Sequence, residues 1–293
     1  MILESGESND RFVYWRNTVI ISTSDHDNQT HDSKNTNSMH TDRKDLICKL
    51  LKGIETGDPE SVTVVNEDKY IQHNPQTHEG SEGLAVLFKR LAETNPHVNI
   101  VRIFEDDDYV FAHTEYDFDS RNVGFEIFRF EDDQAVEHWD NIQQRQGPNP
   151  SGHSMVDGVT EIKELEKTES NREIIRSFVD DVLIKHDAEK IYDYIKWNHY
   201  IEHNPQSSDE LEALIKVVSP ASIDAEDTIT YEKCHRILAE GNFVLTVCEG
   251  NINQQPTSFF DLWLLEHDYI VEHWDTTETI PPPEEWNNDN GKF

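Results

Sequence analysis

The chain has 293 residues, of which 35% are hydrophobic and 29% charged, and its formal net charge is −34. This length suits two domains of ordinary size. The acidic excess argues against nucleic acid and anionic membranes as partners, because phosphate binding needs clustered Lys and Arg. It is also typical of proteins from a salt-rich cytoplasm, where screened surface carboxylates keep a protein hydrated, so halophilic origin is one hypothesis.

Neither a membrane span nor a disulfide framework is predicted. No apolar run approaches the ~20 residues that cross a bilayer, and the polar N-terminus lacks a signal-peptide core, so we expect a soluble cytoplasmic protein. Cys48, Cys234 and Cys248 are odd in number and scattered, which is atypical of disulfide scaffolds or metal knuckles.

Residues 1–40 are rich in polar residues and are predicted to be a flexible segment. Their histidines, His26, His31 and His40, are too loosely spaced to indicate a metal site.

Two motifs each occur twice. YIQHNPQ at residues 70–76 recurs as YIEHNPQ at 200–206, and VEHWD at 136–140 recurs at 271–275. Helical and strand patterns repeat in the same order, which indicates a tandem duplication. The predicted division is a first domain at 41–146, a linker at 147–168, a second domain at 169–280 and a tail at 281–293.

In chain order, each predicted domain has helices first and strands afterwards. Asp42 is a plausible cap for a helix with an apolar stripe, and a second helix is predicted over 83–93. β-branched and aromatic residues then predict four strands, at 98–102, 109–116, 123–130 and 135–142. The second domain is predicted to start with a capping box at 170–173. Helices followed by an antiparallel meander indicate the α+β class.

The VEHWD motif is predicted to be a strand with alternating faces. His138 and Asp140 then share one face, and Trp139 points to the other, where it suits packing. A buried carboxylate beside an imidazole is a workable proton-transfer pair, and His273 and Asp275 repeat it. A purely structural role, with both groups satisfying neighbouring backbone, remains an alternative.

The HNP motif places His73 and His203 next to a turn fixed by the Asn-Pro pair. They either satisfy local backbone groups or lie at the rim of the cavity as donors to a substrate oxygen. A metal site that combines His73 with His138, or His203 with His273, is a third alternative, but zinc prefers three or four ligands and no HxH or HExxH motif is present. No metal is predicted.

Further candidates are weaker. Glu115 and Glu249 occupy equivalent strand positions and are candidates for a substrate-binding carboxylate. His113 has Val247 as its counterpart, which indicates that the two cavities differ and that one repeat alone could be active. The flanking residues predicted to contact substrate are Tyr70, Asn74, Tyr200 and Asn204.

The chain resembles a known family in these motifs. YIQHNPQ followed by FEIFRFEDDQAVEHWDNIQ resembles the SnoaL-like polyketide cyclase branch of the NTF2-like superfamily, and more narrowly SnoaL-like aldol-condensation enzymes. The second copy keeps both motifs but has 263–265 as Trp-Leu-Leu where the first has Phe-Arg-Phe. The resemblance implies two tandem cone-shaped domains, each a curved antiparallel sheet wrapped around helices with one pocket.

For function, the resemblance implies a general acid/base in that pocket, without metal or cofactor, at Asp140 or Asp275, assisted by the motif histidines. We therefore expect a lyase or isomerase with aldol-type or cyclase proton-transfer chemistry on a small molecule in a hydrophobic pocket. The alternative is a non-catalytic small-molecule-binding protein. The repeats are expected to pair as an internal pseudo-dimer, and a homodimer of chains is equally compatible with the sequence.

Overall fold

The computed structural model describes residues 42–118, 120–196, 198–219 and 228–293. The predicted N-terminal segment 1–40, with its three histidines, lies outside the described residues. Thr41–Phe293 forms one compact unit. Among the helices of the described ranges, none is long and apolar enough to cross a membrane.

The first lobe, residues 43–144, opens with the predicted capped helix. Helix α1 (Arg43–Thr56) is capped by the Asp42 carboxylate, which accepts a hydrogen bond from the Lys44 backbone N–H at 2.9 Å. The helix ends at Gly57, which has a φ of 68°. The 3-10 helix η1 (Ser61–Val64) and helix α2 (Gly80–Ala92) follow, and α2 begins three residues before its predicted start at 83.

The first sheet has the strand order β1-β5-β4-β3-β2. Its four long strands form the predicted antiparallel meander. The short strand β1 pairs in parallel with β5, with Gln72 opposite His138, so the HNP loop lies beside the VEHWD strand. The strands are β1 (Ile71–Gln72), β2 (His97–Asp106), β3 (Tyr109–Asp117), β4 (Arg121–Glu131) and β5 (Gln134–Gln144).

The second lobe, residues 165–279, repeats this order. Its sheet runs β6-β10-β9-β8-β7, and β6 pairs in parallel with β10 as β1 does with β5. The helical elements are η2 (Leu165–Lys167), α3 (Thr168–Phe178), the π-helical η3 (Val179–Ile184), η4 (Ala188–Lys190), α4 (Ile191–Tyr194) and α5 (Leu211–Val218). The strands are β6 (Ile201–Glu202), β7 (Ile229–Glu240), β8 (Phe243–Ile252), β9 (Gln255–Glu266) and β10 (Tyr269–Thr279). Two sheets with their own helices confirm the α+β class.

The predicted capping box of the second lobe is wrong. Helix α3 already begins at Thr168, so Ser170 lies inside its first turn, where its hydroxyl donates to the Lys167 carbonyl at 2.9 Å. The helix starts earlier because η2 leads directly into it.

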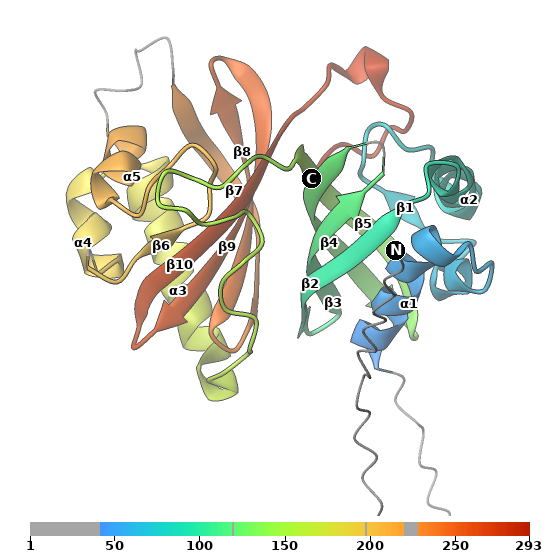
Figure 1. Ribbon diagram of the computed structural model, residues 1–293, viewed down its shortest axis with the longest axis horizontal. Helices are drawn as coiled ribbons and strands as arrows, with labels where there is room; N and C mark the ends of the chain where they lie inside the picture. Colours follow the sequence, from blue (N-terminus) through green and yellow to red (C-terminus); the bar gives the residue numbers. More distant parts are fainter. Residues whose placement is uncertain (1–41, 119, 197, 220–227) are drawn as a thin grey trace, which may run out of the picture. The chain divides into compact units, whose positions relative to one another are not determined.

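The buried apolar residues form three clusters. One lies between the helices and sheet of the first lobe, and another between those of the second. The third joins the other faces of the two sheets and includes the fully buried rings of Trp139 and Trp274. The helices of each lobe lie on the face of its sheet that is turned away from the other sheet (Figure 1).

Each lobe is followed by a segment that covers the HNP loop of the other lobe. The linker after β5 places the Ser154 carbonyl 2.7 Å from His203 Nδ1. The tail after β10, red in Figure 1, contains η6 (Pro283–Glu285) and places the Gly291 carbonyl 2.9 Å from His73 Nδ1. The lobes therefore exchange their C-terminal extensions.

Candidate active site

The first lobe contains a cavity of about 340 Å³ between its helices and its sheet. Apolar side chains of α1 and α2 line one end, and polar groups of β1, β4 and β5 line the other. The apolar lining includes Leu50, Leu51, Ile54, Leu84, Leu87, Phe88 and Leu91. A small cavity with one polar end suits a compact, largely apolar ligand with few polar atoms.

Strand alternation determines which motif residues face this cavity. On β5, His138 and Asp140 line the cavity, while Trp139 between them packs in the cluster between the sheets. On and beside β1, Tyr70, Gln72 and Asn74 line the same cavity. The two motifs are far apart in sequence and meet because β1 pairs with β5.

His138 lies in a buried hydrogen-bond network. Its Nδ1 is 3.0 Å from Gln72 Oε1, which also accepts the backbone N–H of Asn74 at 2.8 Å. Its Nε2 is 2.7 Å from Glu126 Oε2, and the Tyr116 hydroxyl donates to Glu126 Oε1 at 2.5 Å. Because Gln72 Oε1 acts as an acceptor, Nδ1 carries a proton, and Nε2 and Glu126 share a second one. Burial raises the pKa of Glu126 despite the opposing effect of His138, which favours such sharing.

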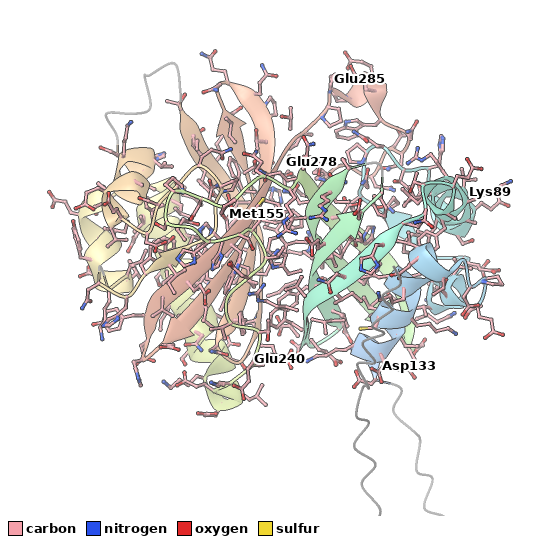
Figure 2. The ribbon with its side chains drawn as sticks, in the orientation of Figure 1. Lys89, Asp133, Met155, Glu240, Glu278 and Glu285 are labelled. Atoms are coloured by element: carbon pink, nitrogen blue, oxygen red, sulfur yellow. The ribbon has the colours of Figure 1, made fainter. Side chains whose placement is uncertain are left out.

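Asp140 lies at the junction of both lobes. Its Oδ2 accepts a hydrogen bond from Asn74 Nδ2 at 2.7 Å, and its Oδ1 is 3.6 Å from Lys292 Nζ. The same ammonium donates to Glu278 Oε2 at 2.7 Å. Glu278, labelled in Figure 2, belongs to β10 yet lines the first cavity.

Tyr70 contributes a hydroxyl to the cavity wall. This buried hydroxyl has no hydrogen-bond partner among the described residues. Burial, together with the charges of Glu126 and Asp140, raises its pKa well above the ordinary value, so it stays a donor. An unpartnered donor beside a carboxylate can bind a substrate oxygen.

His73 is not at the rim of the cavity, in contrast to the functional alternative for the HNP motif. It lies on the opposite face of the sheet, stacked on Trp139 with ring centroids 4.7 Å apart, and its Nε2 is 2.9 Å from Glu137 Oε1. The reason is alternation along β1, which turns Gln72 inward and His73 outward. His203 repeats this arrangement with Glu272 and Trp274. Since His73 and His138 face opposite sides, they cannot share a metal ion.

The candidate carboxylates on β3 and β8 also point away from the helix-covered face of their sheets. Glu115 pairs with Arg145, and Glu249 lies 3.2 Å from His235. Tyr116, the residue after Glu115 on β3, faces the first cavity instead, because successive side chains alternate. His113 is buried on the same outward face, where Arg102 Nη1 lies 3.0 Å from its Nδ1.

The second lobe has an equivalent but differently charged cluster. His273 lies between two carboxylates, with Nδ1 2.9 Å from Glu202 Oε1 and Nε2 3.2 Å from Asp261 Oδ1. Although burial opposes it, the charges of Glu202 and Asp261 raise the pKa of His273 well above its usual range. The Tyr200 hydroxyl donates to Glu202 Oε2 at 2.7 Å and is therefore occupied, unlike that of Tyr70.

Asp275 is the second-lobe counterpart of Asp140. Asn204 Nδ2 donates to its Oδ2 at 2.7 Å, as Asn74 does to Asp140. Burial raises the pKa of Asp275 to about 7, with Glu202 and Asp261 adding to the rise.

Sequence reasoning missed Gln72, Glu126, Glu278 and Lys292. A signal existed for Glu126, because an acid stands at the same place in two apolar strands, as Glu126 in FEIFRF and Asp261 in FDLWLL. Gln72 differs from Glu202 within the repeated motif, which is visible in the sequence as well. No local pattern links Glu278 or Lys292 to the first lobe, since only the exchange of extensions brings them there.

A cation could be held by the same groups. Donor atoms of Glu126, His138 and Asp140 lie within 4.8 Å of one another. A nitrogen and two carboxylate oxygens are a donor set that divalent cations accept. The Lys292 ammonium already lies 3.6 Å from the Asp140 carboxylate, which such a cation would share.

Comparison with known proteins supports the family. Residues 49–138 match the model of the SnoaL-like domain. The first lobe therefore matches the SnoaL-like domain that the motifs resemble. The match ends at His138, so the duplication itself stays a prediction. No curated protein sequence is significantly similar to the chain.

Solved structures of low identity resemble one part of the chain. TsrD from Streptomyces laurentii is 21% identical, with 34% of this chain and 86% of that one covered and a TM-score of 0.31. A putative polyketide cyclase from Bacillus cereus ATCC 10987 is 18% identical, with 33% and 72% covered and a TM-score of 0.31. An LEH-like epoxide hydrolase from M. tuberculosis is 16% identical, with 34% and 82% covered and a TM-score of 0.31.

Proposed function

We propose that the first lobe is a cofactor-free lyase or isomerase that moves a proton next to a carbonyl group of a small, largely apolar molecule. The observation that carries this proposal is the polar end of the first cavity, where Asp140, the His138–Glu126 pair and the unpartnered Tyr70 hydroxyl line one space.

The proposed roles follow from the position and the hydrogen-bond contacts of each group. Asp140 takes the proton from the carbon next to the carbonyl, and the electron pair of that C–H bond forms an enolate. The Tyr70 hydroxyl donates a hydrogen bond to the enolate oxygen. The His138–Glu126 pair returns a proton, either to a second carbon in an isomerisation or to the alkoxide formed when the enolate closes a carbon–carbon bond. Acid–base assistance of this kind contributes about 10²–10⁴ in rate.

The volume and the lining of the cavity limit the size and polarity of the proposed substrate. About 340 Å³ is near the lower end of the range of small-molecule sites, ~300–1,000 Å³. The apolar end formed by α1 and α2 favours an alkyl or aromatic group. The second lobe is proposed to act as a scaffold, because Tyr200 is occupied and His273 is held between two carboxylates.

Exchange of hydrogen for deuterium tests the proposal without a known substrate. The protein is incubated in D₂O with a panel of small ketones, aldehydes and β-dicarbonyl compounds, and loss of the α-proton signal is followed by NMR. We expect exchange with at least one class, a loss of at least about 100-fold in Asp140→Asn, and a loss of about 10-fold or more in Tyr70→Phe. Asp275→Asn is the matched control and should keep the wild-type rate.

A non-catalytic binding protein would behave differently. Native mass spectrometry would then show a retained small molecule, and no compound of the panel would exchange above the solvent rate. Equal losses in Asp140→Asn and Asp275→Asn would instead contradict the assignment of the first lobe as the active one.

A further inference from the structure

The tail after β10 is bound closely to the HNP loop of the first lobe. The backbone N–H of Asn287 donates to the Pro75 carbonyl at 2.8 Å, and Asn288 Nδ2 donates to the carbonyls of Asn74 and Thr77 at 2.8 and 3.0 Å. Asn290 Nδ2 donates to the Gln72 carbonyl at 3.0 Å. These bonds fix the tail directly before Lys292.

Lys292 is an unusual group for such a segment. Its side chain is 2% exposed, and its two anionic partners are Glu278 at 2.7 Å and Asp140 at 3.6 Å. A buried ammonium is costly unless carboxylates compensate it. Burial raises the pKa of Glu278, with Lys292 opposing the rise and Asp140 adding to it.

The second lobe has other residues at the positions equivalent to Lys292 and Glu278. The Ser154 carbonyl contacts His203 as the Gly291 carbonyl contacts His73. The residue that follows each carbonyl along the chain, Met155 or Lys292, therefore occupies the equivalent position. Met155, labelled in Figure 2, is 2% exposed, so both positions are buried. Gln143 stands on β5 where Glu278 stands on β10, and its Oε1 accepts the backbone N–H of Thr277.

The consequence is a difference between two equivalent aspartates. Within the described residues, Asp140 has an ammonium within 4 Å and Asp275 has none. Burial raises the pKa of Asp275 to about 7, with His273 opposing the rise and Glu202 and Asp261 adding to it.

We infer that Lys292 is a positioning residue of the first cavity, which places a positive charge beside Asp140, so that the second lobe completes the active site of the first. This inference rests on the proposed function for calling the cavity an active site, while the ion pair between Lys292 and Asp140 can be tested independently of it.

The charged and titratable groups described around Asp140 enter the balance. Lys292 is the buried cation beside it, and the exposed Arg90 also lines the cavity. The His138–Glu126 pair shares a proton, and Glu278 is the second carboxylate. The hydroxyls of Tyr70 and Tyr116 are neutral. Loss of the ammonium therefore leaves Asp140 among groups that disfavour its charge.

Thermal unfolding as a function of pH tests the electrostatic role. The reference is Glu278→Gln, which copies Gln143 and leaves Asp140 as the single carboxylate partner of Lys292. In the double variant Glu278→Gln/Lys292→Met, which copies both second-lobe residues, Asp140 loses its cation and should bind a proton at higher pH than in the reference. The unfolding temperature should then fall relative to the reference as pH rises from about 5 to about 8, by about 4 °C or more.

Two further variants decide between charge and packing. Adding Asp140→Asn to the double variant should remove the extra pH dependence, and Lys292→Arg in the reference background should not create it. A double variant that loses the same number of degrees at every pH would overturn the inference. If the double variant does not fold at any pH, failure of Asp140→Asn to restore folding would overturn it as well.

The deuterium-exchange assay gives the second readout. Lys292→Met should move the acidic limb of the rate profile upward by at least about one pH unit, with Lys292→Arg restoring it. An unmoved profile would overturn the positioning role. If no compound exchanges at all, the proposed function fails, and the thermal unfolding series still decides what Lys292 does.

Discussion

Gln72 Oε1 lies 3.0 Å from Nδ1 of His138, and this contact distinguishes the first site from the second. In the second lobe, Glu202 occupies the place of Gln72 and brings a charge to His273. The neutral amide leaves one carboxylate for His138, at Glu126, and leaves the Tyr70 hydroxyl unpartnered. The two histidines therefore differ in the number of carboxylates that they contact.

Gln72→Glu should convert the first site into a copy of the second. His138 would then lie between two carboxylates, as His273 does, and Tyr70 would donate to the new carboxylate. We expect deuterium exchange to fall at least about 10-fold, because the Tyr70 hydroxyl would then be occupied as that of Tyr200 is. Glu202→Gln is the control in the second lobe, and an exchange rate that falls in that variant instead would contradict the assignment.

Asp275 should make stability depend on pH. Its pKa rises from 3.8 to about 7 on folding, so the folded state binds a proton that the unfolded state has lost in this range. The free energy of unfolding therefore falls as pH rises from about 4 to about 7, by up to ~1.4 kcal/mol per pH unit for this group, and levels off above 7. Asp275→Asn should remove that slope in urea unfolding measured at several pH values. A slope unchanged by the substitution would show that Asp275 is ionised throughout.

Trp139 should be important for the stability of both lobes. Its ring is 1% exposed in the cluster between the sheets, and the Arg236 guanidinium lies 3.7 Å above it. Trp139→Ala should cost about 3–5 kcal/mol in the free energy of unfolding, measured with urea. Val86→Ala is the control, because Val86 is 62% exposed and should change stability by about 0.5 kcal/mol or less. If Trp139→Ala also changed the free energy of unfolding by about 0.5 kcal/mol or less, the stability of each sheet would not depend on packing against the other.

Salt should stabilise the protein if the hypothesis of halophilic origin holds. The net charge of −34 makes carboxylates repel one another, and added KCl screens this repulsion. We expect the unfolding temperature to rise between about 0.1 M and about 2 M KCl. An unfolding temperature that is independent of KCl would remove the hypothesis and leave simple solubility as the reason for the charge.

The architecture could be predicted because local sequence patterns repeat in the same order. Helical stripes, alternating strands and turn residues act over a few positions, so the α+β class, the main strands and the placement of His138 and Asp140 on one strand face could be predicted. The position of helix α3 could not, because η2 extends it toward the N-terminus beyond the Ser170 signal.

The composition of the site was decided by pairings between distant segments. The sequence alone determined that His138 and Asp140 share a face, since alternation is a property of every strand. Only the tertiary structure turned His73 away from the cavity, since the pairing of β1 with β5 orients the HNP loop. Only it brought Glu126 against His138, and Glu278 and Lys292 against Asp140, because cross-strand register and the exchange of extensions join residues that no local pattern connects.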